Sequence, residues 1–306
     1  MGPFVALTLL IISLFWSHPL SATDRFQGHH LWEVQAPNGT KSYIAANGAP
    51  ASERGVSLLQ RQMKAAASVR RMAVFNQHHD LTILSGEWSR RADEILPEDL
   101  LATLETELGP SLRAIWGADP SSVRRLKLEG IRILLSSSPT RFYVKGLSPI
   151  ETIMSAFQRE REGVLILEPS TSGDLLDLIS KARAQEMRSP AEIIGIILRD
   201  RLAHGPIGDR VANAFLAGNW HEVRALAPAE WLALLGFEHE ALDQLQFKST
   251  DDLADRIFAA LSDVLTLVMV PGGELAREPG LFTVLQQRGF EIKPVHLPKT
   301  APMAGQ

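Results

Sequence analysis

Apolar and polar positions follow their clearest pattern in the C-terminal part of the chain. From Leu253 to Leu261 apolar residues recur every three or four positions, which predicts a helix with one buried face. The apolar run Val264–Val270 comes next, and its continuity is typical of a strand that is covered on both sides. Pro271-Gly272-Gly273 ends this run. Helix, buried strand and glycine turn together indicate an α/β layer.

The same layer continues to the C-terminus, and a hairpin at the other end of the chain matches it. A second helix is expected to begin at Pro279 and to end at Gly289, and a strand is expected over Phe290–Val295. Near the N-terminus, His30–Val34 and Ser42–Ala46 flank an Asn-Gly turn, the strongest short signal for a β-hairpin. Strands from both ends of the chain are therefore predicted to share a sheet.

Between these ends the pattern predicts further helices and strands. Helices are expected at Leu58–Ala67 and Glu98–Leu108, strands at Met72–Phe75, Leu81–Leu84 and Val164–Leu167, and either a helix or a strand at Arg132–Ser136. Residues 174–245 have helical periodicity nearly throughout, with breaks at prolines and glycines. The predicted fold class is α/β, with a central mixed β-sheet built from N- and C-terminal strands, flanking helices and a mainly helical middle section.

The first residues have the pattern of a secretory signal. Phe4–Trp16 is an uncharged, mostly apolar run, and Pro19 and the small residues Ser21-Ala22 follow it. We expect cleavage near Ala22 and a periplasmic or secreted protein, with an α/β domain over residues 23–297 and a disordered tail over residues 298–306. The run is shorter than the roughly 20 residues that span a bilayer, but an uncleaved N-terminal anchor or a mis-assigned start codon remains an alternative.

Composition excludes several classes of protein. The 306 residues include no cysteine, which excludes disulfides and thiolate chemistry, and a net charge of -4 offers no basic surface for nucleic acid. No later segment is long and apolar enough to span a membrane. Nucleophile elbows and phosphate-binding glycine loops are also missing from the sequence. The expected partner is an unidentified envelope protein or peptide.

Motifs in a fixed order give the chain a family resemblance. They lie near the N-terminus, in the middle and near the C-terminus: Leu31-Trp32-Glu33-Val34, Tyr43-Ile44-Ala45, Gly146–Glu168, Phe215–Asn219, Val270–Leu275 and Gly280-Leu281. In this order the chain resembles the TraB/PrgY/GumN family, which includes the TIKI-like metalloproteases. The resemblance implies an α/β fold and, for intact members, a metal site formed by histidines and carboxylates at strand ends.

The residues of that implied metal site are largely replaced. Ala46 and Ala49 stand where the family has the glycine and histidine of its first Gly-x-x-His motif, and Pro271 and Glu274 stand at the second. Glu168 is retained at the end of its strand. Glu168 and Glu274 are therefore the candidate catalytic and metal-binding residues. Two carboxylates alone would hold Mn²⁺, Mg²⁺ or Co²⁺ weakly, and a solvated turn residue is the simpler interpretation of Glu274.

Other histidines are weaker candidates. His78-His79-Asp80 is the densest cluster, and His29-His30 precedes the first strand. Neighbouring histidines on a strand point to opposite faces, so only one of each pair can reach a common ion, and surface loop histidines are the simpler interpretation. His204 is expected to stabilise the C-terminal end of a helix. Four tryptophans at helical apolar positions are expected in the core: Trp88, Trp116, Trp220 and Trp231.

Two functional hypotheses follow. The first is a non-catalytic relative of the family, a binding or scaffolding protein that lost the metal site, for which no cofactor is predicted. The second is a metal-dependent hydrolase with a divergent site at Glu168 and Glu274. The second requires these carboxylates within about 5 Å of each other, so that they share an ion.

Overall fold

The computed structural model describes residues 26–47, 52–75, 87–136, 163–167, 189–226, 253–275 and 280–298. Several sequence predictions concern residues outside these ranges: the signal segment up to Ala22, the residues Ala49, Glu168 and Trp231, the cluster His78-His79-Asp80, and the strand Leu81–Leu84. They remain predictions. No helix among the described residues is long and apolar enough to cross a membrane.

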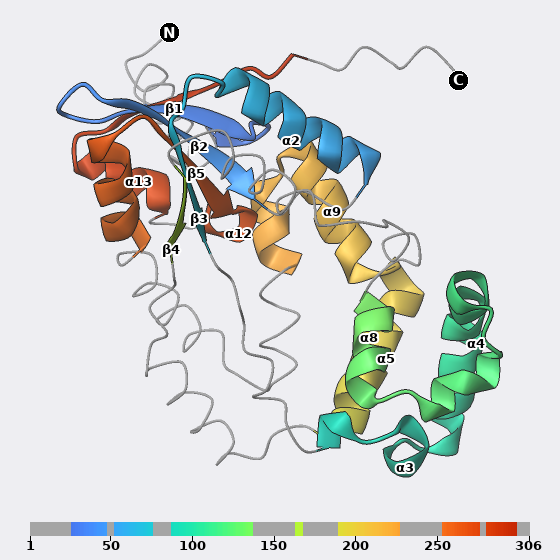
Figure 1. Ribbon diagram of the computed structural model, residues 1–306. Coiled ribbons are helices and arrows are strands. Elements are labelled where there is room, and N and C mark those ends of the chain that lie inside the picture. Colours follow the sequence, from blue (N-terminus) through green and yellow to red (C-terminus); the bar gives the residue numbers. More distant parts are fainter. Residues whose placement is uncertain are drawn as a thin grey trace, which may run out of the picture.

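A mixed sheet of six strands forms one part of the molecule (Figure 1). In spatial order the strands are β4 (Val164–Leu167), β3 (Arg71–Phe75), β5 (Thr266–Pro271), β2 (Lys41–Asn47), β1 (Leu31–Gln35) and β6 (Glu291–Pro294). The neighbours β4, β3, β5 and β2 are parallel, and β1 is antiparallel to both β2 and β6. The predicted central mixed sheet of N- and C-terminal strands is thereby confirmed.

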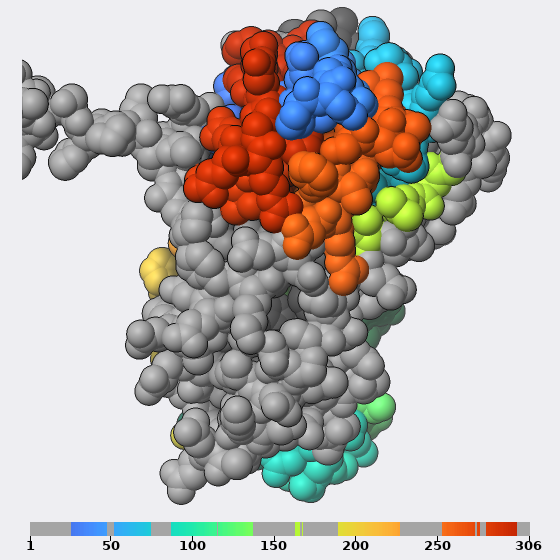
Figure 2. Space-filling model, turned by 90° about the vertical axis from the view of Figure 1, so that its left-hand side faces the viewer, coloured from blue at the N-terminus to red at the C-terminus, as the bar shows by residue number. Residues whose placement is uncertain are grey.

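The hairpin explains how the two ends of the chain meet. β1 and β2 pair with Val34 opposite Ser42, and Asn38 supports the turn by accepting a hydrogen bond from the Thr40 amide at 3.0 Å. β6 then pairs with the outer side of β1, with Trp32 opposite Pro294. In the space-filling view the N-terminal residues (blue) accordingly lie beside the C-terminal segment (red) (Figure 2). Glu291, Lys293 and Pro294 give β6 a charged, proline-ended edge that discourages further strand pairing.

Each face of the sheet is covered by different helices, because side chains alternate along the strands. Helix α2 (Glu53–Ala65) packs on one face, where Leu59 meets Leu267 and Met269. The helical residues 253–263, α13 (Leu281–Gln287) and the end of α9 (Ile207–Ala217) pack on the opposite face, against Val268 and Val270. Both faces of β5 are fully buried, as its continuous apolar sequence predicts.

A second hydrophobic core lies to one side of the sheet, in a group of helices (Figure 1). These helices are η3 (Glu87–Ser89), α3 (Ala92–Ile95), α4 (Glu98–Trp116), η4 (Pro120–Arg125), α5 (Leu128–Ser136) and α8 (Pro190–His204). Leucines at four-residue spacing on α4 and isoleucines on α8 fill this core. The mainly helical character predicted for the middle section is confirmed for residues 189–226, apart from short breaks.

Helix α2 begins at Glu53 instead of near the predicted Leu58, helix α4 is longer than predicted, and one open choice is settled. Helix α4 continues to Trp116 instead of ending near Leu108, although Pro110 lies inside it. Proline removes one backbone hydrogen bond, but Pro110 is exposed while Leu108 and Leu112 are buried, so the apolar contacts that favour the helix continue past it. The open choice at Arg132–Ser136 is settled as the end of helix α5.

The tryptophan predictions hold for two of the described residues. Trp88 and Trp220 are buried, whereas Trp116 is 58% exposed and the prediction of a core position is wrong. Trp116 continues the four-residue spacing of buried Leu104, Leu108 and Leu112. On a helix of 3.6 residues per turn, this spacing rotates by about 40° at each step, so the stripe turns away from the core by the last turn.

Candidate functional site

The carboxyl ends of β2, β3, β4 and β5 lie at one edge of the sheet, where α/β proteins commonly bind ligands. This edge is also where the sequence places its candidate residues. Asn47 ends β2 opposite Pro271, the last residue of β5. The short helix α12 (Gly272–Leu275), which contains Glu274, follows β5 directly and contacts β2.

Aromatic side chains from α9 and from the start of the helical residues 220–226 fill the part of this edge beside β2 and β5. A Cβ atom added to Gly272 would lie 3.1 Å from the Trp220 ring and 3.3 Å from the Phe215 ring. Trp220 is fully buried, and its ring centroid lies 5.2 Å from that of Phe215 and 6.2 Å from that of Trp32. We call His30, Trp32, Phe215 and Trp220 the aromatic joint.

His30 is a structural member of this joint. Its Nε2 donates a hydrogen bond to the Phe215 carbonyl oxygen at 2.7 Å, since a carbonyl can only accept. Burial lowers the pKa of His30, and the hydrogen bond to Phe215 offsets only part of that effect. The Gln62 side chain also donates to the His30 carbonyl, at 2.6 Å. The interpretation of His30 as a surface loop residue is therefore wrong, because the histidine joins the strand β1 to helix α9.

Two backbone segments next to the aromatic joint, at Gly28 and Gly218, also pack closely against each other. Gly218 ends α9 with φ of 69°, and a Cβ at this position would lie 2.8 Å from the Gly28 Cα atom. The Gly28 amide donates to the Gly218 carbonyl at 3.0 Å. The Trp220 indole Nε1 donates to the carbonyls of Phe26 and His29, at 3.3 and 3.1 Å. The segment before β1 is thus fixed to the end of α9.

Of the two candidate carboxylates, Glu274 lies at the carboxyl edge and Glu168 lies outside the described residues. Glu274 is half-buried, and its Oε2 atom is shielded from solvent, so it is less solvated than a simple turn residue. Ala46, at one of the replaced positions, is completely buried. Strand β3 separates β4 from β5, so the strand ends that precede Glu168 and Glu274 are two strand spacings apart, about 10 Å.

Metal ligands do not gather elsewhere in the described ranges. Among these residues no group of three or more histidines, aspartates or glutamates is arranged to hold a metal ion. His204 lies in the last turn of α8, as expected, with Nδ1 3.0 Å from the Asp200 carboxylate.

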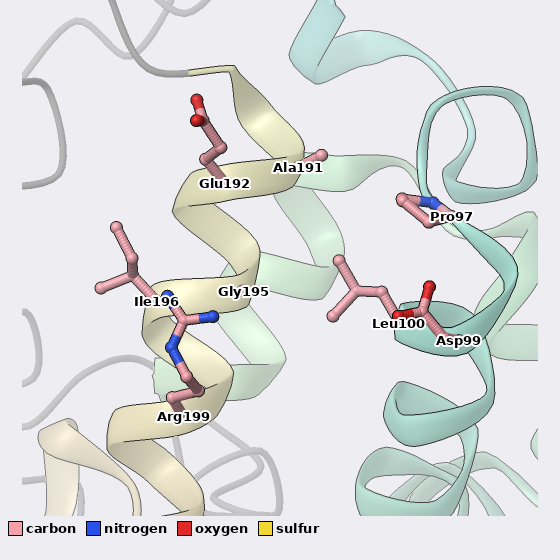
Figure 3. A pocket seen from close by; sticks show the side chains of 8 residues that line it. All are labelled: Pro97, Asp99, Leu100, Ala191, Glu192, Gly195, Ile196 and Arg199. Atoms are coloured by element: carbon pink, nitrogen blue, oxygen red, sulfur yellow. The ribbon is translucent and has the colours of Figure 1, made fainter.

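A groove of about 520 Å³ opens between α4 and α8 in the helical part of the molecule (Figure 3). It is lined by residues around the first turn of α4 and the first three turns of α8: Pro97, Asp99, Leu100, Ala191, Glu192, Gly195, Ile196 and Arg199. Leu100 points from α4 toward α8, where Gly195 has no side chain to meet it (Figure 3). We call this feature the α4–α8 groove.

An ion pair further along the same helices holds them together. The buried Arg201 of α8 donates from Nε to the Glu107 carboxylate of α4 at 2.7 Å, and from Nη1 to the Leu134 and Leu135 carbonyls of α5. Helix α5 packs against α8 and shares its core. The groove contacts precede the ion pair along both α4 and α8, so the two helices run in the same direction.

The three charged side chains of the groove differ in whether they have a partner within the described residues. Glu192 forms the capping box of α8 with Ser189, whereas Asp99 and Arg199, from opposite walls, form no ion pair with any other described residue. Gly195 is also unexplained by packing, because an added Cβ would meet only the Arg199 guanidinium at 3.5 Å, an ordinary contact. A glycine inside a helix costs about 1 kcal/mol relative to alanine.

Sequence patterns did not predict this groove, because its walls come from segments far apart in the chain. Its one local signal is Gly195, an isolated glycine in a helical pattern. Comparison with family models, with curated proteins and with solved structures finds no match to this chain. The site must therefore be interpreted from its own geometry.

Proposed function

We propose that this chain is a binding or scaffolding protein of the cell envelope without catalytic activity, a divergent relative of the TraB/GumN family. The α4–α8 groove is its binding site, and the occupant is an amphipathic helix of a partner protein. The observation that carries this proposal is the contrast at Gly195: a buried helix position with room for a side chain faces a groove that the described residues leave unfilled.

The shape of the groove favours a helix as its occupant. Ala191, Gly195 and Arg199 follow each other at four-residue spacing, so they form one row along α8. Small side chains at two of these positions let another backbone approach closely, and rows of this spacing are the ridges between which helices pack. Leu100 and Ile196 add apolar area to the walls. An amphipathic helix in an apolar groove is a common mode of peptide recognition.

Charge gives the occupant a preferred arrangement. Asp99 on α4 would attract a basic residue on one flank of the docked helix, and Arg199 on α8 an acidic residue on the other flank. Both side chains are exposed, so each pair would contribute at most about 1 kcal/mol. These charges select orientation more than they add affinity.

The proposal is tested with a synthetic helical peptide. The probe carries a leucine stripe at helical spacing, with lysines along one flank and glutamates along the other, and a fluorescent label for anisotropy. We expect saturable binding to the wild-type chain and loss of binding to Gly195→Leu, whose side chain would fill the groove. Gly195→Ala is the matched control, because its single methyl group leaves most of the groove open and should leave binding within about threefold of wild type.

Two results would contradict this proposal. One is equal binding of the probe by the wild type and Gly195→Leu, with both proteins folded by circular dichroism. The other is no binding by the wild type. The first would move the binding surface elsewhere, and the second would remove the amphipathic helix as the occupant.

Metal-dependent hydrolysis by Glu168 and Glu274 is the alternative function, and the shielded Oε2 atom of Glu274 is the observation in its favour. It is tested by exposing the protein to Mn²⁺, Co²⁺ and Zn²⁺, desalting it and measuring retained metal. Near-stoichiometric metal that is lost in both Glu168→Ala and Glu274→Ala would support a hydrolase and justify a peptidase screen.

A further inference from the structure

Two histidines far apart in the sequence meet where the chain enters and leaves the sheet. The imidazole rings of His29 and His296 lie 5.1 Å apart between centroids, with their planes inclined by 68°. His29 precedes β1, and His296 follows β6, just beyond the paired residues Trp32 and Pro294. Within the described part of the chain, neither ring forms a hydrogen bond.

The backbone holds both histidines in place. The His29 carbonyl accepts the Trp220 indole hydrogen bond, and the next residue, His30, is bonded through its carbonyl to Ala46 and Gln62. On the other side, the Val295 amide donates to the Leu31 carbonyl at 2.9 Å, directly before His296. Leu297 after it packs against the core. The two rings are therefore carried by fixed backbone on both sides.

The separation of the rings matches that of two ligands of one metal ion. Imidazole nitrogens bind Zn²⁺ at about 2.0–2.1 Å in a tetrahedral arrangement, which places two ring centroids about 5.2 Å apart. We propose that His29 and His296 form a site for one divalent transition-metal ion, such as Zn²⁺ or Cu²⁺. Water completes the coordination and leaves positions open.

The exposure and chemistry of the rings fit this role. His29 is half-buried and His296 is exposed, so an ion bound between the two rings could keep water in its remaining coordination positions. Imidazole selects Zn²⁺, Cu²⁺ or Ni²⁺ over Mg²⁺ and Ca²⁺. His29 faces His296 while the adjacent His30 faces Phe215, so one histidine of the pair is free for the metal and the other is structural.

A metal at this position would act as a clamp. It would connect the segment before β1 to the segment after β6, and so tie both ends of the described chain to each other. Because the unfolded chain has no such preformed pair, binding would stabilise the folded state in proportion to the logarithm of metal concentration. This site lies apart from the α4–α8 groove and does not depend on the proposed function.

The test is calorimetric titration of the untagged full chain with ZnCl₂, together with thermal unfolding at increasing zinc concentration. We expect binding of one ion and a rising Tm, both lost in His29→Gln and in His296→Gln. MgCl₂ should have no effect on either measurement. Imidazole ¹⁵N resonances of His29 and His296 should shift on zinc addition, while that of His30 should not.

Matched variants separate this site from other histidines. His204→Gln, and the double variant His78→Gln/His79→Gln, should bind zinc as the wild type does. Zinc binding that survives in His29→Gln or His296→Gln, or that disappears in His78→Gln/His79→Gln, would overturn the proposal. Metal lost in the glutamate variants but not in these histidine variants would support the hydrolase alternative instead, so the two ideas are distinguished.

Discussion

The carboxyl edge of a parallel sheet and a groove between helices are both common positions for ligand sites. In this molecule the two differ in packing: part of the sheet edge is filled by side chains, and the α4–α8 groove is open. At the sheet edge, a Cβ at Gly218 would collide with the Gly28 backbone, and a Cβ at Gly272 would press closely on the Trp220 ring. In the groove, a Cβ at Gly195 would meet only the Arg199 guanidinium among the described residues, at an ordinary contact distance of 3.5 Å. A glycine thus marks a closed contact in one region and an open one in the other.

This difference indicates where binding capacity remains. The aromatic joint uses aromatic rings, an imidazole and several backbone hydrogen bonds to fix the first strand to α9, so that part of the edge serves stability. The helical region is instead held by its core and by the Glu107–Arg201 ion pair, and it leaves a groove open between α4 and α8.

The tryptophans give the largest expected contrast. Trp220→Ala should lower the free energy of unfolding by about 3–5 kcal/mol, because it removes a fully buried ring from the aromatic joint. Trp116→Ala, at the exposed end of α4, should change it by less than about 1 kcal/mol. Urea denaturation of both variants measures this. Similar losses for the two variants would show that the joint does not carry the stability assigned to it.

Alanine substitutions at Gly218 and Gly195 should change the free energy of unfolding in opposite directions. Gly218→Ala should destabilise the fold by about 2 kcal/mol or more, since alanine would adopt a left-handed conformation and its Cβ would collide with the Gly28 backbone. Gly195→Ala should stabilise it by up to about 1 kcal/mol through higher helix propensity. Chemical denaturation again decides the outcome, and a destabilising Gly195→Ala would mean that the groove wall is packed and not open.

Burial of His30 makes the stability of the aromatic joint depend on pH. Because burial lowers the pKa of His30 in the folded state, the unfolded chain binds its proton first as pH falls. Stability from this residue is therefore complete above the unfolded value of about 6.5 and is lost as pH falls from there to the folded pKa, by at most about 1.4 kcal/mol per pH unit. His30→Gln keeps a donor for Phe215 and should flatten this slope between pH 7.5 and 5. An unchanged slope would assign the pH dependence to other groups.

Local sequence patterns predicted much of the sheet. The Asn-Gly turn defined the β1–β2 hairpin, and the uninterrupted apolar run before Pro271 identified β5 as a central strand. These elements follow from turn chemistry and from burial on both faces, which are properties of short segments. Helix α4 was harder, because Pro110 is a local stop signal that the buried leucines around it override.

The candidate sites depend on contacts between distant segments, so sequence reasoning reached them only in part. It placed Glu274 and Ala46 at strand ends, but it gave no sign that Phe215 and Trp220 would fill the space beside them. It singled out His29, but its partner, His296, lies at the other end of the chain. The groove walls near Leu100 and Gly195 likewise meet only after folding.

The measurement that tests the central claim most directly is a reversal of charge preference in the α4–α8 groove. Two peptides of identical composition, one with its lysine and glutamate flanks exchanged, are titrated against the wild type and against the double variant Asp99→Lys/Arg199→Glu. The account predicts that the wild type favours one peptide by about 1 kcal/mol, roughly fivefold in Kd, and that the double variant favours the other. The same preference in both proteins, or none in either, would contradict it.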